Sequence, residues 1–162
     1  MSANPTPHTV ICSWCDSTIR SGSPTLPVSH GLCLPCLQTE FGYPVENLST
    51  MSQHSFDCLP FGLIQLDRDG LILSYNAAEA KLAHLIAAEV IGKHFFRDIA
   101  PCTRVKEFEG RWLKMLDSPI PVRDKFNYLF KFSHGTAFVQ VALTFDPTQN
   151  KTSILIRQLD KG

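Results

Sequence analysis

Hydrophobic and polar residues alternate along the last third of the chain. Between 126 and 132 an aromatic residue takes every second position, with Lys125, Asn127 and Lys131 at intervening positions. A period of two is typical of β-strands with one buried face. Turn-forming sequences stand at 133–136 and 146–151. The pattern therefore predicts three antiparallel strands in sequence: Phe126–Phe132, Ala137–Phe145 and Thr152–Leu159.

Two shorter strands and a helix precede this meander. Phe61–Leu66 is an apolar run, Asp67–Gly70 has the composition of a hairpin turn, and Leu71–Tyr75 continues as a second strand. Asn76 is followed three residues later by Glu79, which is the pattern of a capping box at a helix start. The chain is therefore expected to change from strand to helix at residues 75 and 76.

A second helix is predicted further along the chain. Apolar residues at 105, 108, 112 and 115 have the spacing of one buried helix face (Val105, Phe108, Trp112 and Met115). Two strands, several short helices and three further strands indicate an α+β domain of roughly a hundred residues. Helices on one face of its sheet would leave a cavity between the two layers, the natural place for a small molecule.

Composition narrows the range of partners. The 162 residues are 44% hydrophobic, enough for one globular core, and 15 basic residues balance 15 acidic ones. Without a net charge, no general attraction to nucleic acid or to an anionic membrane is expected. No apolar segment is long enough for a membrane span, and residues 1–8 lack the features of an export signal. We therefore expect a cytoplasmic protein.

Four of the six cysteines form two closely spaced pairs. Two residues separate Cys12 from Cys15 and Cys33 from Cys36, and seventeen residues lie between the pairs. This spacing is typical of a four-cysteine zinc site, whose metal would supply the folding energy of a turn-rich segment. His30 is an alternative ligand beside the second pair. Two redox-active dithiols are the alternative to zinc.

These features divide the chain into four parts. We expect a flexible N-terminus at 1–8, a zinc-ribbon-like element at 9–38, a linker at 39–57 and the α+β domain at 58–162. Between the first and last of the four cysteines the only charges are Asp16 and Arg20, which is too few for phosphate binding. The segment is similar to short cysteine-rich elements beside sensory domains of bacterial signalling proteins, which implies a signalling context.

The polar residues of the second domain carry a more specific resemblance. The matching positions run without a gap from about 59 to 108 and include Leu59–Asp67, Tyr75–Glu79, Val90–Lys93 and Ala100–Thr103. This stretch resembles photoactive yellow protein, a branch of the PAS sensory fold. The resemblance implies a PAS domain, with a five-stranded antiparallel sheet flanked by short helices, and a non-enzymatic blue-light sensor.

The same resemblance implies a pigment and the residues that hold it. Cys102 takes the place of the cysteine that forms a thioester with 4-hydroxycinnamic acid (p-coumaric acid). Tyr75 and a protonated Glu79 match the groups that hold its phenolate, and Phe95 and Phe96 are candidates for the pocket wall. Light-driven isomerisation with proton transfer from Glu79 would be the switch, and its output would act in trans on a separate signalling protein.

Other interpretations remain open. Ala83 and Leu85 stand where the family usually has threonine and arginine, so we expect shifted absorption and altered recovery kinetics. A pigment-free PAS interaction module would need Cys102 only as a small buried residue. A redox switch or enzyme has less support because no general base is paired with that thiol in a recognisable motif. A homodimer is a further alternative.

Overall fold

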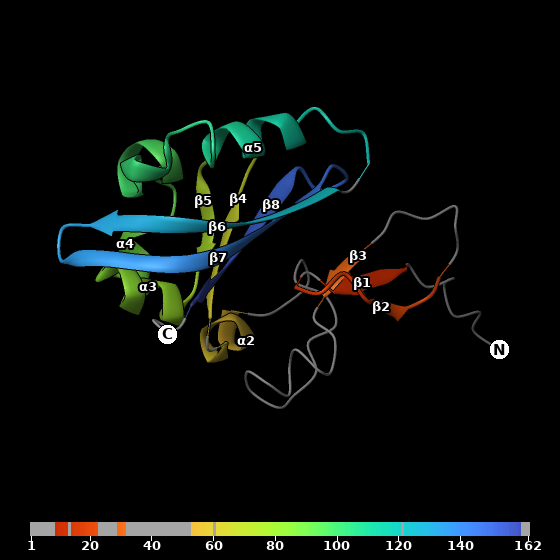
Figure 1. Cartoon of the computed structure of the whole chain (residues 1–162), viewed down its shortest axis with the longest axis horizontal. Coiled ribbons are helices and arrows are strands. Elements are labelled where there is room, and N and C mark those ends of the chain that lie inside the picture. Colours follow the sequence, from red (N-terminus) through yellow and green to blue (C-terminus); the bar gives the residue numbers. More distant parts are fainter. Residues whose placement is uncertain are drawn as a thin grey trace. The chain divides into compact units, whose positions relative to one another are not determined.

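The chain forms two compact units, Met1–Met51 and Ser52–Gly162. The computed structural model describes residues 9–12, 14–22, 29–31, 53–59, 61–120 and 122–159 (Figure 1). No helix within these ranges is long and apolar enough to cross a membrane.

The first unit contains a small three-stranded sheet. Its strands are β1 (Val10–Cys12), β2 (Thr18–Arg20) and β3 (Ser29–Gly31), in the order β2-β1-β3. β1 is antiparallel to β2 and parallel to β3. The parallel pairing places the ends of β1 and β3 side by side, with Cys12 beside Gly31.

The second unit is built on a five-stranded antiparallel sheet, as predicted. The strand order is β5-β4-β8-β7-β6, so the first strand of this unit lies between the second and the last (Figure 1). Ile64 pairs with Tyr75 on one side and with Ile154 on the other. The bounds are β4 (Gly62–Leu66), β5 (Ile72–Tyr75), β6 (Val122–Phe132), β7 (Gly135–Asp146) and β8 (Lys151–Gln158).

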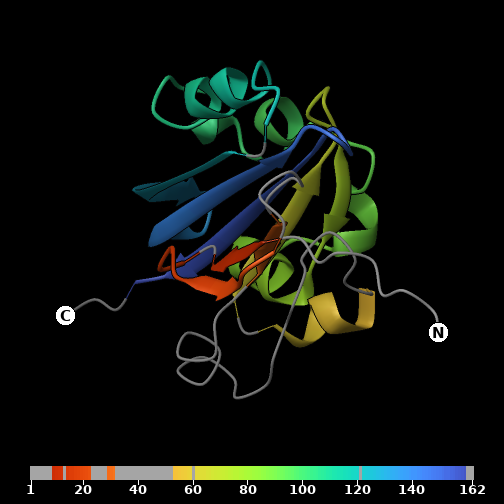
Figure 2. The ribbon, with the colours of Figure 1, turned by 90° about the vertical axis from the view of Figure 1, so that its right-hand side faces the viewer.

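Short helical segments connect β5 to β6. They are α3 (Ala77–Ala83), α4 (Ala87–Val90), a π-helical turn (Phe95–Ile99), a 3-10 turn (Pro101–Thr103) and α5 (Glu109–Met115). A further helix, α2 (Gln53–Cys58), precedes β4. Figure 2 shows the connecting segments from the side and α2 near the lower end of the sheet.

The predicted second helix is shorter than its apolar pattern. α5 begins only at Glu109, after the buried side chain of Phe108, and its inner face carries the buried Trp112 and Met115. Val105 lies before the helix in a turn, and its side chain is 41% exposed. Its assignment to the buried stripe was wrong, because helical spacing continues in the sequence beyond the point where the backbone is helical.

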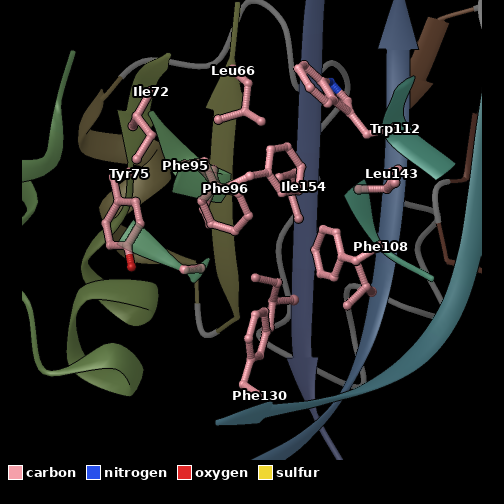
Figure 3. Close-up of a cluster of buried hydrophobic side chains, with 14 of the residues drawn as sticks. Leu66, Ile72, Tyr75, Phe95, Phe96, Phe108, Trp112, Phe130, Leu143 and Ile154 are labelled. Carbon is pink, nitrogen blue, oxygen red and sulfur yellow. The ribbon is translucent and has the colours of Figure 1, made fainter. Parts of the chain in front are cut away.

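Aromatic side chains dominate the core between the sheet and the helical segments. Phe96 packs against Trp112 with ring centroids 4.9 Å apart, and Phe108 contacts Phe95, Phe96 and Phe130 at 5.8 to 6.1 Å. In Figure 3 these rings lie beside Leu66, Leu143 and Ile154 of the sheet. Full burial of each such ring contributes about 2 kcal/mol to folding. The core therefore fixes the π-helical turn and α5 on the sheet.

Asn76 joins three parts of this unit. Its side-chain carbonyl oxygen accepts hydrogen bonds from the backbone N–H groups of Leu63 (2.9 Å) and Glu79 (3.1 Å). Its amide donates to the carbonyl oxygen of Phe61 at 2.9 Å. The side chain is fully buried. One residue therefore caps α3 and ties its first turn to the start of β4.

Replacing Asn76 should destabilise the fold. Asn76→Ala leaves two buried N–H groups and one carbonyl group without their partner, and we expect a loss of about 2–4 kcal/mol in the free energy of unfolding. Urea unfolding followed by circular dichroism measures it. The exposed Asn127→Ala on β6 is the control and should change the value by less than about 0.5 kcal/mol. Equal effects of the two substitutions would contradict this role.

Candidate functional site

A cavity of about 240 Å³ lies between the sheet and the helical segments of the second unit. Tyr75 and Glu79 line one part of it, and Cys102 lines another. Four of the five predicted pigment-binding residues, Phe95 included, therefore share one cavity. The remaining wall comes from Ala83, Leu85, Ile99, Ala100, Pro101, Phe130, Lys131, Phe132 and Ser133.

Glu79 is the most unusual group in this cavity. Its side chain is only 2% exposed, and its Oε2 atom has no hydrogen-bond partner in the described part of the chain. Burial raises the pKa of the carboxyl group from 4.5 to about 8, because the charged form loses its hydration. Most molecules therefore carry a neutral carboxylic acid here at pH 7, with an O–H that can donate to a bound group.

The capping box predicted from Asn76 and Glu79 is only half formed. Asn76 does cap the helix, since its side chain accepts from the Glu79 backbone N–H. The Glu79 side chain, however, lies in the cavity. A capping box needs the side chain to return to the start of the helix. The sequence spacing allows both arrangements and only the packing decides between them.

Gly62 on β4 provides the space for this carboxyl group. A Cβ atom at Gly62 would overlap Oε2 of Glu79 and would also contact its Cβ and Cδ atoms. Any larger residue would therefore displace the acid from its present position. This role of Gly62 has no signature in the sequence, because it depends on the approach of α3 to β4.

Tyr75 is the last residue of β5, and its side chain is 2% exposed. Burial raises the pKa of its hydroxyl group, and the negative charge of an ionised Glu79 would raise it further. The hydroxyl group is therefore protonated near neutral pH and available as a donor. In Figure 3 it points away from Ile72 and Leu66.

Cys102 lies in the 3-10 turn, half-buried at the cavity wall. Two hydrogen bonds fix this turn: the Tyr128 hydroxyl donates to the Cys102 carbonyl oxygen at 2.5 Å, and Thr103 Oγ1 donates to the Ala100 carbonyl oxygen at 2.6 Å. Burial, and then the nearby charges of Cys102 and Glu107, raise the pKa of Tyr128 and keep its hydroxyl a donor. The thiol is therefore held at the cavity by a fixed backbone.

The two neighbouring phenylalanines of the π-helical turn have different positions. Phe95 lines the cavity, whereas Phe96 packs between Trp112 and Phe108 and is absent from the cavity wall. Lys131 and Ser133, beside Phe132 near the end of β6, reach the cavity and were not expected there. The alternation of polar and apolar residues did not predict this position for them. Consecutive residues line the cavity here, because β6 ends at Phe132.

Relatives of known sequence decide the family. A family model for the PAS fold matches residues 46–156. Photoactive yellow protein of Rhodothalassium salexigens is 37% identical over 116 residues, 71% of this chain and 92% of that protein. Photoactive yellow protein of Cereibacter sphaeroides is 32% identical over 115 residues, with the same coverage. The chain belongs to the photoactive yellow protein family.

Solved structures agree with this assignment. The photoactive yellow protein domain of the sensor histidine kinase Ppr from Rhodospirillum centenum has a TM-score of 0.64 and 33% identity, over 68% of this chain and 96% of that one. A PAS domain of an HTR-like protein from Haloarcula marismortui shares the fold at a TM-score of 0.53 and 20% identity, over 66% of this chain and 93% of that one. The photoactive yellow protein and PAS assignments point to a photosensory or signalling role.

The first unit presents one pair of cysteines in the described residues. Cys12 is buried at the end of β1 and Cys15 is exposed in the turn that follows. The backbone N–H of Trp14 donates to Cys12 Sγ at 3.4 Å, and the Asp16 N–H donates to the Cys12 carbonyl oxygen at 3.1 Å. Asp16 has a φ of 67°, which closes the turn. This tight turn links the two cysteines at the end of β1.

Cys33 and Cys36, the other two predicted zinc ligands, lie outside the described residues, as does the side chain of His30. Within the described ranges, no three potential ligand side chains form a metal cluster. The backbone of β3 does run beside β1, with Cys12 paired to Gly31. Cys33 follows Gly31 by two residues, a chain length of about 7 Å.

The raised pKa of Glu79 predicts a distinct pH dependence of stability. The folded pKa of about 8 exceeds the ordinary 4.5, so Glu79 favours folding below pH 4.5 and this contribution is lost as the pH rises to 8. Relative to Glu79→Gln, the pigment-free wild type should therefore lose unfolding free energy across this interval. Denaturant unfolding at several pH values measures it. The exposed Glu89→Gln should follow the wild type; a Glu79→Gln curve parallel to the wild type would refute the assignment.

Proposed function

We propose that the second unit is a blue-light sensor with 4-hydroxycinnamic acid bound as a thioester to Cys102. The observation that carries this proposal is the buried Glu79 acid, whose Oε2 has no partner among the described residues. Buried polar groups normally have a hydrogen-bond partner, and an orphaned one calls for an explanation. A phenolate oxygen in the cavity would accept from Glu79 and from the Tyr75 hydroxyl group.

The chemistry of the cavity fits this pigment. It has a thiol, whose thiolate form attacks an activated acyl carbon and displaces the activating group. It also has two O–H donors, Tyr75 and Glu79, and the apolar ring of Phe95. An aromatic acid needs all three features: an attachment point, an apolar wall and donors for its phenol oxygen.

When bound, the pigment would supply light absorption, an isomerisable double bond and a phenolate that takes up a proton. The chain supplies that proton from Glu79. Its loss leaves a buried carboxylate, which is unfavourable by several kcal/mol unless a cation or water reaches it. Of the residues lining the cavity, only Lys131 has a formal positive charge, and its side chain is exposed.

Movement of α3 would relieve this charge. Glu79 lies in the first turn of α3, and Asn76 connects that turn to β4 through its three hydrogen bonds. Displacement of the helix start would hydrate Glu79 and would also break the Asn76 contacts. The rearranged surface would act in trans on a separate signalling protein, without enzymatic turnover.

Pigment binding should depend on Cys102 alone among the cysteines of this unit. The full chain is reconstituted with an activated ester of 4-hydroxycinnamic acid, beside Cys102→Ala and the matched control Cys58→Ala, an exposed thiol outside the cavity. We expect a visible absorption band in the wild type and in Cys58→Ala that bleaches under blue light and recovers in the dark.

The absence of a band from the wild type, or a band that persists in Cys102→Ala, would overturn the sensor proposal. The first result would favour the alternative function, a pigment-free PAS interaction module. Ala83 and Leu85 give that alternative its basis, since both departures from the family pattern lie in the cavity wall.

We also propose that the first unit binds zinc through Cys12, Cys15, Cys33 and Cys36. Support comes from Cys12 at the end of β1, from Cys15 in the turn that follows, and from the parallel register that pairs Cys12 with Gly31, two positions before Cys33 in the sequence. The Trp14 N–H bond to Cys12 Sγ would stabilise a thiolate ligand. The metal would hold the small sheet together, a structural role.

Metal analysis of the purified chain tests this site. We expect about one zinc per chain, lost in Cys15→Ser and kept in Cys58→Ser, because a structural zinc site needs all four ligands. Mass spectrometry of native thiol labelling is the second measurement. Zinc-free wild-type protein with four freely reactive thiols would contradict the proposal.

A further inference from the structure

Two histidine rings lie face to face beside residues that line the cavity. The ring centroids of His84 and His134 are 3.5 Å apart and their planes differ by 11°. His84 ends α3, and His134 lies in the turn between β6 and β7. Both side chains are exposed, so both can exchange protons with solvent.

This pair connects two segments of the cavity wall. Ala83 and Leu85, the immediate neighbours of His84, line the cavity, and so do Phe132 and Ser133, which precede His134. The Phe132 ring stacks on His134 with centroids 5.0 Å apart. Separation of the two histidines would therefore release the turn from the end of α3 and widen the rim.

The helix end holds both rings in position. His84 has a φ of 57°, and its backbone N–H contacts the carbonyl oxygens of Ala80 and Lys81, which terminates the helix. His134 Nε2 lies 3.2 Å from the Leu82 carbonyl oxygen. With a proton on Nε2, His134 donates to this carbonyl in its neutral and its charged form. One positive ring is thus tolerated at the helix C-terminus.

A second positive charge has no counter-ion among the described residues that line the adjoining surface cavity. Of the residues that line the adjoining surface cavity, Lys81 on α3 is the one with a formal charge, and those from β6, β7 and β8 are uncharged. Lys131, near the end of β6, adds a further cation beside the rim. Two charged imidazoles at 3.5 Å would therefore repel each other without compensation.

We propose that His84 and His134 form a proton-sensitive latch, which holds the rim of the Cys102 cavity closed and opens when both rings are charged. Imidazole changes its charge between about pH 5 and pH 8. The latch would thereby set the access of pigment precursor to Cys102 and the stability of the closed rim. Its purpose depends on the proposed function, whereas its opening is a property of the pigment-free chain.

Access to Cys102 measures the latch directly. The pigment-free full chain is treated with a dipyridyl disulfide, a thiol reagent that works in acid, from pH 8 to pH 5. Peptide mass spectrometry follows Cys102, and each rate is divided by that of the urea-unfolded chain, which removes the intrinsic pH dependence of the thiol. We expect the ratio to rise about fivefold toward pH 5, the effect of two like charges near 4 Å in water.

Two variants distinguish the effect of histidine charge from the effect of ring stacking. His134→Phe keeps a flat ring but cannot be protonated, so its ratio should stay constant with pH. His84→Asn keeps a residue that tolerates the left-handed backbone but removes the stack, so its ratio should be high at every pH. Circular dichroism at each pH verifies that both variants are folded.

A wild-type ratio that does not change with pH, or the same pH slope in wild type and His134→Phe, would overturn the latch. Either result leaves the sensor proposal intact, because pigment attachment is tested separately with Cys102→Ala. Conversely, a chain that binds no pigment but shows the expected slope would retain the latch and lose the sensor.

Discussion

A neutral carboxylic acid in an apolar interior is the constraint on which the second unit depends. Glu79 is buried at the start of α3 with a pKa near 8, and its Oε2 lacks a partner in the described ranges. Several features permit this arrangement. Asn76 fixes the helix start, Gly62 leaves room on β4, and Tyr75 adds a second donor beside the cavity. Each supports a group that is unfavourable by itself, which is typical of a site retained for function.

The aromatic core on the sheet and the wall of the cavity are built differently. Large aromatic rings fill the space near Trp112 and Phe108, where rigidity anchors the π-helical turn and α5. Around Cys102 the wall is made of short segments from different parts of the chain, and the stacked rings of His84 and His134 lie beside two of them. Segments with few buried contacts are the ones that open most easily, so the cavity wall is better suited to movement than the aromatic core.

Sequence patterns predicted the fold better than the site. Alternation identified the last three strands of the second unit, because a half-buried strand has a period of two, and an apolar run followed by a hairpin turn identified the first two. The resemblance selected Cys102, Tyr75 and Glu79, which do share one cavity. The direction of the Glu79 side chain, the different environments of Phe95 and Phe96, and the exposure of Val105 depend on where helical backbone begins and ends. Neighbouring residues therefore receive opposite environments that no local pattern distinguishes.

The position of β4 has a consequence for the order of events during synthesis. β4 pairs with β8, so that Ile64 meets a residue that leaves the ribosome ninety positions later, Ile154. Long-range pairing of this kind is slow to form and cannot begin before the partner strand is available. The cavity wall of β5, α3 and β6 is supported by this sheet. Cys102 is therefore translated well before the cavity around it exists, and the proposed acylation of its thiol would require the finished domain.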